Sequence, residues 1–381
     1  MARIVVGSWM VRYPLGGNLS WTLQWLVGFQ RLGHDVYLVE KSGYPNSCYD
    51  PVKAVMSDDC SCGMAIVNAL LKRFDLQDKW CFVDARERYH GLSREHVEAV
   101  FKLADLFVDI GTHGAWLDEA GNARLRVLVD GEPGFRQMKM EKSLAAGEML
   151  PSYDFYYSNG ANVGTTRSTA PRAGKQWRPL FNPVVVRLFP RQPVGADAPF
   201  TTVMNWQAHE PIKFNGKTYG QKDVEFVKFI DLPSLTTSPL EIAVSGKNVP
   251  TKRLIDSKWR VRDAHDVTVS FDSYREYIRA SKGEFSVCKS GYVATSCGWF
   301  SDRSAAYLAS GRPVVMQDTG FRAHLPCGRG LFAVCTVDEA AAAIDEISGD
   351  YERHSKWARD IAIEYLDAPK VLGRFLYELG I

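Results

Sequence analysis

The stretch Glu284–Phe321, EFSVCKSGYVATSCGWFSDRSAAYLASGRPVVMQDTGF, decides the fold of this chain. Its apolar beginning over residues 284–288 predicts a short buried strand, and the Gly- and Ser-rich residues 289–300 predict a loop. Residues 301–310 predict a helix, and residues 314–316 begin the next strand. The order strand, loop, helix, strand predicts a unit of an α/β sheet.

The ends of this predicted helix carry the expected signals. Ser301 and Asp302 offer side-chain oxygens that accept hydrogen bonds from the first free backbone N–H groups, and Gly311 followed by Pro313 ends the helix. The helix therefore opens directly from the loop, at the carboxyl end of the preceding strand.

The loop and the helix start form a predicted anion site. Free backbone N–H groups and the helix dipole both favour negative charge at such a position. Lys289 and Arg303 add two positive charges at the same end. We expect a phosphate-bearing ligand here, and the alternative is an ordinary turn with two solvated cations.

A similar unit opens the chain. Residues 3–7 (RIVVG) predict a parallel strand, residues 19–32 a helix and residues 36–40 a second strand. Gly16 and Gly17 lie between the first strand and the helix, where they either let the backbone approach a phosphate or form a tight turn. The spacing is not that of the GxGxxG dinucleotide fingerprint.

Three further apolar runs in the first half, over residues 106–110, 126–130 and 154–157, predict strands that end in polar, Gly-containing loops. Such ends gather along one functional edge of a parallel sheet. His113 follows the first of these strands, and Asp130 ends the second.

The second half repeats this alternation after a Pro-, Arg- and Trp-rich segment over residues 172–199, which predicts an interdomain linker. We expect an α/β protein with two Rossmann-like, doubly wound domains facing a cleft. The predicted domains are residues 1–188 and 189–365, with a last helix within 366–381 that packs back on the first.

Composition limits the classes of protein that fit. With 381 residues, of which 46% are hydrophobic and 24% charged, the chain is long enough for two globular domains. A formal net charge of +2 argues against a strongly electrostatic partnership with DNA or a membrane. We expect a cytoplasmic protein without a membrane span, in which Cys60 and Cys62 are free thiols rather than metal ligands.

Two stretches resemble a known family. Residues 16–40, GGNLSWTLQWLVGFQRLGHDVYLVE, and residues 301–321, SDRSAAYLASGRPVVMQDTGF, look like the two halves of a GT-B glycosyltransferase. The resemblance implies a nucleotide-sugar site in the C-terminal domain and an acceptor site in the N-terminal domain. One departure is Ala306, where the family commonly has an acidic residue.

The expected activity is the transfer of a sugar from a nucleoside-diphosphate sugar, most simply a UDP-sugar, to an acceptor hydroxyl of a small metabolite, a glycan or a hydroxylated nucleic-acid base. We expect no metal and no further cofactor, because positive side chains and helix N–H groups can stabilise the departing diphosphate. Nucleic acid is a possible but disfavoured acceptor. The alternatives are an epimerase of the same fold and a sugar-nucleotide-binding protein without turnover.

His113 is the first candidate for the base, because an unperturbed histidine titrates near neutral pH, and Asp130 is the reserve. If the sugar keeps its configuration, no protein base is needed and His113 contacts the sugar instead. Trp206 is expected either to stack on a ring of the donor or to pack between the domains. The expected donor-binding residues are Gly16, Gly17, Asn205, Trp206, Lys222, Lys289, Ser301, Arg303, Ser304, Gln317, Asp318 and Thr319.

Overall fold

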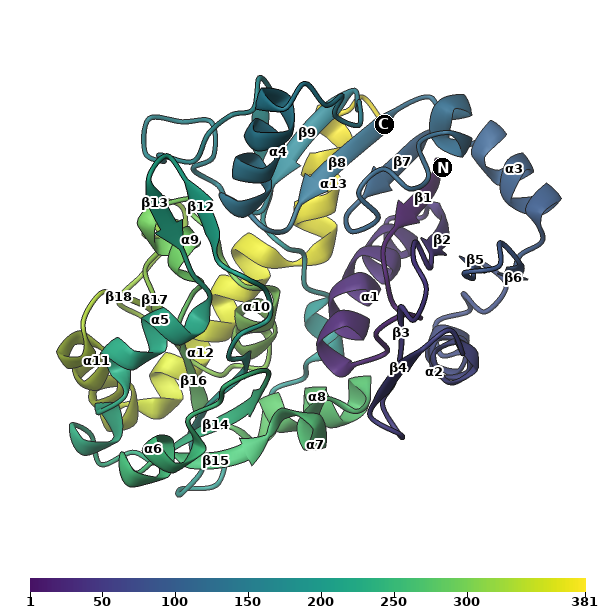
Figure 1. The fold of residues 1–381 in the computed structure, drawn as a ribbon. Coiled ribbons are helices and arrows are strands. Elements are labelled where there is room, and N and C mark those ends of the chain that lie inside the picture. The colour runs from purple at the N-terminus through teal and green to yellow at the C-terminus, as the bar shows by residue number, and fades with distance from the viewer.

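Two parallel sheets organise the chain in the computed structural model, which describes residues 1–381 (Figure 1). The first sheet has eight strands, in the spatial order β10 (Trp177–Pro179), β9 (Phe155–Ser158), β8 (Arg126–Asp130), β7 (Leu106–Asp109), β1 (Arg3–Gly7), β2 (Asp35–Lys41), β5 (Trp80–Val83) and β6 (Tyr89–Gly91). All of its neighbours pair in parallel except β5 and β6.

The second sheet has six strands, all parallel, in the spatial order β15 (Arg260–Asp263), β14 (Leu240–Ser245), β11 (Phe200–Asn205), β16 (Gly283–Ser286), β17 (Val314–Gln317) and β18 (Leu331–Val334). Central strands such as β16 and β17 are buried at every residue, as expected where helices cover both faces of a sheet. The two-domain α/β fold predicted from the sequence is confirmed.

The helices divide between the two sheets. Those that accompany the first sheet in the sequence are α1 (Gly16–Arg31), α2 (Ser61–Lys72), α3 (Arg94–Lys102) and α4 (Phe135–Ala145). Those that follow are α5 (Lys222–Phe226), α6 (Thr251–Asp256), α7 (Ala264–Thr268), α8 (Phe271–Ala280), α9 (Ser290–Ala294), α10 (Asp302–Ala309), α11 (Val337–Gly349), α12 (Tyr351–Ile361) and α13 (Ala368–Glu378). None of them combines the length and apolar character that crossing a bilayer requires.

Two hairpins lie outside the sheets. The strands β3 (Cys48–Asp50) and β4 (Val55–Ser57) pair with each other, as do β12 (Ile212–Phe214) and β13 (Lys217–Tyr219). Asn215 and Gly216 join the second pair with φ angles of 46° and 73°, which is the left-handed geometry that a two-residue hairpin turn requires.

Some boundaries differ from those predicted. Helix α1 begins at Gly16 rather than at residue 19, so both loop glycines belong to its first turn. The expected loop over residues 289–300 contains the short helix α9. The expected linker contributes β10 to the first sheet, where Pro179 is tolerated because β10 is an edge strand.

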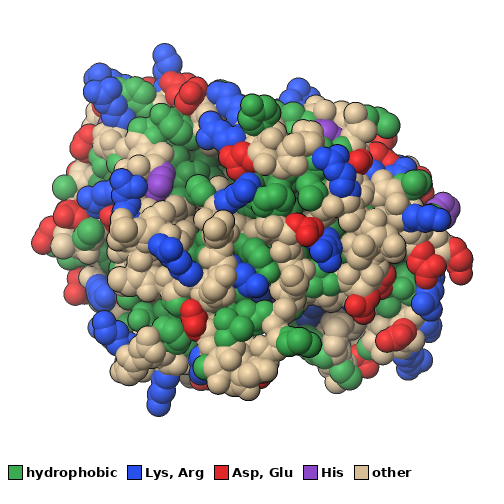
Figure 2. Space-filling view, turned by 90° about the horizontal axis from the view of Figure 1, so that it is seen from above, with side chains coloured by type: hydrophobic (Ala, Val, Ile, Leu, Met, Phe, Trp, Pro, Cys, Tyr) green, Lys and Arg blue, Asp and Glu red, His purple; other side chains and the backbone are tan.

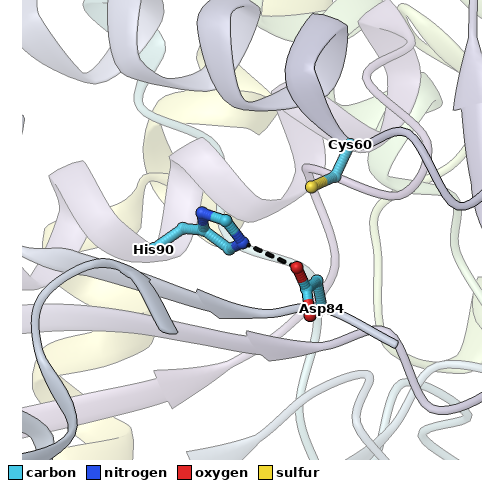
Figure 3. Close-up of side chains that lie close together, drawn as sticks. All are labelled: Cys60, Asp84 and His90. Atoms are coloured by element: carbon cyan, nitrogen blue, oxygen red, sulfur yellow. Dashed lines mark hydrogen bonds and ion pairs between the residues drawn. The ribbon is translucent and has the colours of Figure 1, made fainter. Parts of the chain in front are cut away.

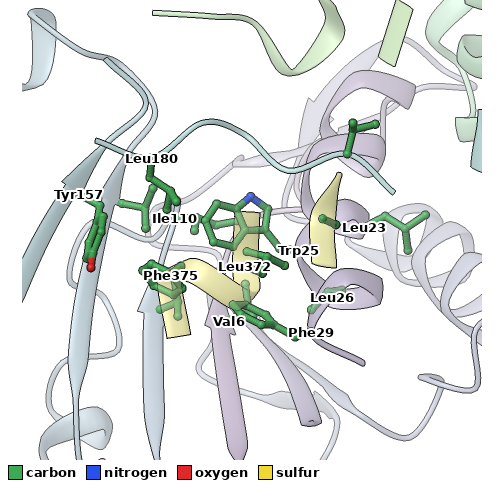
Figure 4. Packing of buried hydrophobic residues seen from close by; sticks show 14 of the residues in the cluster. Val6, Leu23, Trp25, Leu26, Phe29, Ile110, Tyr157, Leu180, Leu372 and Phe375 are labelled. Carbon is green, nitrogen blue, oxygen red and sulfur yellow. The ribbon is translucent and has the colours of Figure 1, made fainter. Parts of the chain in front are cut away.

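We call the domains built on the first and second sheets the first and second lobes. The last helix returns to the first lobe. Figure 1 shows α13, in yellow, leaving the second lobe and crossing behind β8 and β9. Figure 4 shows Leu372 and Phe375 of α13 against Trp25 and Phe29 of α1, and the Phe375 ring lies 6.2 Å from Trp25 and 6.3 Å from Phe29. At Gly28 of α1 any Cβ would lie 2.5 Å from Leu372 Cδ1, so the glycine allows the two helices to approach closely.

Buried apolar residues connect the lobes. One cluster of 80 residues runs from the first sheet through α1, α8, α10 and α13, whereas a second cluster of 21 residues lies within the second lobe. Hydrogen bonds also connect the lobes, since Asn162 donates from Nδ2 to the backbone carbonyls of Ser296 and Gly320. The lobes are therefore packed against each other over part of their facing surfaces.

Charges are mixed over the face seen from above. In Figure 2 the Lys and Arg side chains are interspersed with Asp and Glu, and they form no continuous field of one sign. This face agrees with the formal net charge of +2.

Candidate functional site

Both sheets reverse their strand order at one point, and ligands of open α/β sheets bind outside the carboxyl ends of the strands at that point. In the first sheet, the chain builds outward from β1 to β2 on one side and from β7 to β8 on the other. In the second sheet, the same reversal falls between β11 and β16. A ligand site is therefore expected in the loops that follow these strands.

An ion pair joins the carboxyl edges of the two sheets. Lys289, in the loop after β16, places Nζ 2.6 Å and 2.7 Å from the two carboxylate oxygens of Glu132, in the loop after β8. Burial would raise the pKa of the Glu132 carboxyl, but the Lys289 ammonium holds it below its usual value. Because the Glu132 side chain is still 45% exposed, the pair lies where water reaches it. His209, exposed and close enough for both charges to influence its pKa, extends this group.

Glu40 organises the loop between β1 and α1. Its buried carboxylate accepts backbone N–H bonds from Met10, Val11 and Arg12 at 2.7 to 3.0 Å. Burial nevertheless raises the pKa of this carboxyl to about 7. A ribose contact, which the end of β2 supplies in dinucleotide-binding folds, is therefore not available from Glu40.

The glycines that end this loop have different surroundings. A Cβ on Gly16 would lie 2.4 Å from Tyr274 Cβ and 2.5 Å from the carbonyl oxygen of Ser270, so Gly16 allows α1 to touch α8 of the other lobe. A Cβ on Gly17 would meet nothing within 4 Å. Of the two, Gly17 is the one that leaves room for a ligand.

Asp109 stabilises the loop that contains His113. Its carboxylate lies at the end of β7 and accepts backbone N–H bonds from residues 111–114 at 2.7 to 3.2 Å, together with the Tyr153 hydroxyl at 2.7 Å. His113 takes a left-handed backbone conformation with φ of 55°, which is uncommon for a residue other than glycine. The loop thus holds an exposed imidazole in a fixed position.

His113 lies against a cation. Arg136 of α4 contacts the imidazole ring through Nη2, which lies against Nδ1 and is 3.1 Å from Nε2. Crowding by the surrounding protein and the Arg136 charge lower the pKa of His113 to about 4. The imidazole is therefore neutral at physiological pH, and because a guanidinium only donates, the ring nitrogen that faces Arg136 must accept.

Asp130 does not reach the site. Its side chain is fully buried and accepts hydrogen bonds from Gln137 Nε2 at 2.8 Å, Ser158 Oγ at 3.0 Å and the Glu132 N–H at 2.9 Å. Burial raises the pKa of this carboxyl. The prediction of Asp130 as a reserve base is wrong, because an enclosed carboxylate with these partners cannot take a proton from a bound acceptor.

Arg303 also has a structural role in place of the predicted one. Arg303 is the second residue of α10, and its guanidinium donates to Glu284 Oε1 of β16. It also donates to Ser286 Oγ and the Val203 carbonyl, each at 2.6 Å. The Glu284 side chain has no exposed surface. Because the guanidinium already has these three acceptors, we correct its expected role from a phosphate ligand to a residue that connects β11, β16 and α10.

Lys222 is the cation that remains free. It begins α5 and is half-buried, and its ammonium makes no hydrogen bond or ion pair with another side chain or carbonyl. Burial, followed by the charge of the neighbouring Arg303, lowers the pKa of its ammonium to about 7. An ammonium held beside other cations without an acceptor lies where an anion would be stabilised.

Several other expected donor contacts are occupied by the protein. Ser301 caps α10 through the Arg303 N–H, the buried Ser304 hydroxyl points at Met316 Sδ, and Thr319 donates to the Trp299 carbonyl. Gln317 donates to Glu225 and accepts from the Cys288 N–H. These four side chains stabilise the loops around the site and are not free for a ligand.

Three expected donor residues remain to be placed. Asp318 forms an ion pair with Arg322 at 2.6 Å, and Asn205 is exposed at the end of β11. Trp206 is only 4% exposed and packs on Phe226 with ring centroids 5.5 Å apart. Interdomain or ligand stacking by Trp206 is therefore wrong, because this indole belongs to the core of the second lobe.

Three aromatic residues near the candidate site, Trp9, Tyr13 and Trp21, were not predicted from the sequence as functional candidates. All three are partly exposed, and they surround the loops that follow β1 and β7. Their sequence signal is a large aromatic residue directly after a predicted strand or in the first turn of the helix that follows it.

One group of side chains has the composition of a metal site. Figure 3 shows Cys60, at the start of α2, facing Asp84 and His90, and their potential ligand atoms all lie within 4.8 Å of one another. Asp84 already accepts from His90 Nε2 at 2.9 Å, from Arg88 Nε at 2.8 Å and from two backbone N–H groups. These hydrogen bonds account for the contact of Asp84 with His90, and the Arg88 charge disfavours a cation beside Asp84.

Comparison with known proteins identifies the architecture. The sequence matches no family model and no curated protein. Among solved structures, an α-glucosyltransferase in complex with UDP and a 13-mer DNA aligns with a TM-score of 0.58 and 11% identity, over 100% of this chain and 99% of that one. HepE of Anabaena, in complex with UDP and glucose, aligns with a TM-score of 0.57 and 12% identity over 100% of both chains.

A third structure, AviGT4, a glycosyltransferase involved in avilamycin A biosynthesis, aligns with a TM-score of 0.53 and 12% identity, over 99% of this chain and 96% of that one. Since all three alignments extend over nearly the whole length of both chains, the arrangement of both lobes is shared. The chain has the GT-B fold, with two facing Rossmann-like domains.

Proposed function

We propose that this protein is a glycosyltransferase that moves a sugar from a nucleoside-diphosphate sugar, with a UDP-sugar as the first candidate, to an acceptor hydroxyl. The unpartnered Lys222 ammonium carries this proposal, because it lies beside Arg303 and near Lys289 at the carboxyl edge of the second sheet. A diphosphate would supply the negative charge that the Lys222 ammonium does not find among its protein neighbours. The fold supports the proposal, and the structural neighbours HepE and the α-glucosyltransferase were crystallised with UDP.

The proposed reaction breaks the bond between the anomeric carbon of the sugar and the terminal phosphate oxygen, while an acceptor oxygen forms a new bond to that carbon. The departing diphosphate gains negative charge, which the Lys222 ammonium stabilises, assisted by Lys289 when it leaves Glu132. This arrangement needs no metal ion for the leaving group, and metal independence is part of the proposal.

His113 is proposed to contact the sugar rather than to act as the base. Nδ1, the ring nitrogen closest to Arg136, accepts from it, so Nε2 carries the proton of the neutral imidazole and can donate to a sugar hydroxyl. The acceptor proton then passes to the departing phosphate oxygen, which requires that the sugar keep its configuration. The anomeric configuration of the product, measured by NMR, tests this assignment, and an inverted product would contradict it.

Binding of nucleoside diphosphates tests the donor site. We expect UDP to bind the wild-type protein, and Lys222→Met to weaken binding at least ~10-fold, since a hydrogen bond to a charged group contributes about 1.5–3 kcal/mol. Lys217→Met on the exposed hairpin strand β13 is the matched control and should leave the dissociation constant unchanged. Absence of binding to wild-type protein by any nucleoside diphosphate, in calorimetry at millimolar ligand, would overturn the proposal.

The pH dependence gives a second measurement on the same residue. Because the free Lys222 ammonium has a pKa of about 7, it loses its proton above that pH and binds phosphate less well. UDP affinity should therefore fall between pH 7 and 9, by at most ~10-fold per pH unit for one linked proton. Lys222→Arg, which stays charged, should remove this dependence.

Product analysis separates the alternatives. A transferase releases the nucleoside diphosphate in proportion to the glycosylated acceptor, an epimerase converts the sugar nucleotide without an acceptor, and a binding protein does neither. Each outcome is visible in one chromatogram of the nucleotide products.

A further inference from the structure

A row of partly exposed aromatic side chains leads away from the candidate site along the first lobe. Its members come from four segments of the chain that the fold brings together: the loop after β1, the first turns of α1, the loop after β2 and the strand β3. We define the aromatic strip as Trp9, Tyr13, Trp21, Tyr44 and Tyr49.

The rings of the strip form one connected set. The Trp9 ring centroid lies 6.4 Å from that of Trp21 and 5.6 Å from that of Tyr13, and Tyr13 stacks on Tyr49 at 6.5 Å with an angle of 19° between the ring planes. Tyr44 is 51% exposed, and its hydroxyl is close enough to contribute, after burial, to the raised pKa of Tyr13. All other members keep part of their surface in contact with water.

One end of the strip meets the loops that carry the candidate catalytic groups. A Cβ on Gly111 would lie 2.4 Å from Trp9 Cδ1 and 2.6 Å from Trp9 Nε1, and a Cβ on Gly131 would lie 3.8 Å from Trp21 Cζ2. Gly111 is two residues before His113, and Gly131 is next to Glu132. The aromatic surface therefore begins at the proposed reaction centre and extends outward over β3.

The charges around the strip favour an uncharged ligand. Arg12 lies 4.8 Å from the centre of the Tyr44 ring, but Lys53 is paired with Asp50 at 3.3 Å. Burial, followed by the negative charges of Asp263 and Asp50, raises the pKa of Tyr49. Single-stranded nucleic acid also stacks on aromatic side chains, but it requires a positively charged groove along its phosphates. A row of aromatic faces without such a groove fits sugar rings, whose C–H faces are apolar while their hydroxyls remain in water.

We propose that the aromatic strip binds the acceptor, and that the acceptor is a neutral saccharide of at least two sugar units. The sugar unit that receives the transferred residue lies at Trp9 and Trp21, and the next units lie over Tyr13, Tyr49 and Tyr44. This assignment rests on the proposed function for its role in catalysis, while saccharide binding itself can be measured without a donor.

Saccharide binding in the absence of a nucleotide tests the proposal. We expect a panel of neutral di- to tetrasaccharides to contain ligands that change the tryptophan fluorescence of the wild-type protein, and longer saccharides to bind more tightly than monosaccharides. Trp9→Ala should weaken this binding at least ~10-fold, Trp9→Phe should weaken it less, and both should keep the affinity for UDP within about 2-fold.

Two further variants keep the test informative if Trp9→Ala fails to fold. Tyr49→Ala, on a short hairpin strand, should reduce the affinity for a tetrasaccharide more than that for a disaccharide. Tyr377→Ala on α13, whose ring is 84% exposed, is the matched control and should change neither. Unchanged saccharide binding in both Trp9→Phe and Tyr49→Ala, or no binding across the panel, would overturn the proposal.

The same assay distinguishes the two failures. Salt-sensitive binding of oligothymidylate at the strip, without saccharide binding, would replace the saccharide by single-stranded nucleic acid. Saccharide binding without any nucleoside diphosphate binding would overturn the proposed function and leave the saccharide site standing.

Discussion

Lys289 Nζ lies 2.6 Å from Glu132 Oε1, and this contact joins the carboxyl edges of the two sheets. The residues are 157 positions apart in the sequence. Each sits in the loop that follows a central strand of its own sheet, so the pair marks the place where the two lobes face each other. In the protein without ligand, Glu132 neutralises the charge that a diphosphate would otherwise meet.

The first prediction follows from this competition. Glu132→Gln should tighten UDP binding, because it removes the carboxylate that competes for the Lys289 ammonium, whereas Lys289→Ala should weaken binding at least ~10-fold. Calorimetric titration of both variants measures these effects. Glu98→Gln, which breaks an exposed Arg94–Glu98 pair on α3, is the control, and equal affinities in all variants would contradict a role for Lys289 at the phosphates.

The second prediction contrasts two neighbouring glycines. Gly16→Ala should destabilise the protein by about 1–3 kcal/mol, because its methyl group would overlap backbone and Cβ atoms of α8. Gly17→Ala should fold normally, because its methyl group meets open space. If donor phosphates approach the backbone at this turn, Gly17→Ala should weaken UDP binding without changing the melting temperature. A melting temperature lowered equally in both variants would contradict this difference.

The third prediction concerns the titration of His113. Because its pKa is about 4, the imidazole should stay neutral from pH 5.5 upward, and an NMR titration of its ring should show no inflection between pH 5.5 and 7.5. Arg136→Gln removes the neighbouring positive charge and should move the inflection upward toward 6.5. His113→Ala should reduce turnover by up to ~10-fold with UDP binding intact, because it removes one hydrogen bond to a sugar hydroxyl. A wild-type inflection near 6.5 would contradict the assigned environment.

The fourth prediction concerns the enclosed ion pair below α10. Glu284→Gln should cost about 3–5 kcal/mol of folding free energy, since it leaves the Arg303 guanidinium without its only charged partner. Replacing both residues, as Glu284→Gln with Arg303→Met, should cost less than the sum of the single changes. Chemical denaturation of the three variants measures this coupling. Additive costs would show that the two side chains do not act together.

The fifth prediction concerns metal removal. Transfer activity and melting temperature should be unchanged after dialysis against excess EDTA, because lysine side chains supply the positive charge at the proposed phosphate site and Asp84 has hydrogen-bonding partners within the protein. Loss of activity that Mg²⁺ or Mn²⁺ restores would contradict metal-independent transfer. Loss of stability that Zn²⁺ restores would instead assign an ion to Cys60, Asp84 and His90.

The strand ends could be predicted from the sequence alone, because apolar runs of four to six residues followed by glycine are a strong local signal. The predicted strands over residues 3–7 and 126–130 agree with β1 and β8. For the same reason, the sequence predicted that Lys289 and His113 lie on loops at the functional edges of the two sheets. These are properties of the backbone, which local patterns determine.

Side-chain partners were harder to predict, because they depend on which face of a helix approaches which strand. Arg303 was expected to face a ligand, but the turn of α10 directs it to Glu284. An acidic residue within an otherwise apolar buried strand requires a cationic partner, so Glu284 was a signal for this pair. The burial of Trp206 could not be predicted either, because it depends on packing against Phe226 of α5.

The chain passes between the lobes twice, once after β10 and once before α13, and the two crossings lie side by side. The Val184 N–H donates to the Leu366 carbonyl at 2.8 Å, and the Ala368 N–H donates to the Val184 carbonyl at 2.9 Å. Two crossings of the chain that are joined by backbone hydrogen bonds at one place act as a single hinge. Any rotation of one lobe against the other is therefore expected to turn about an axis near Val184.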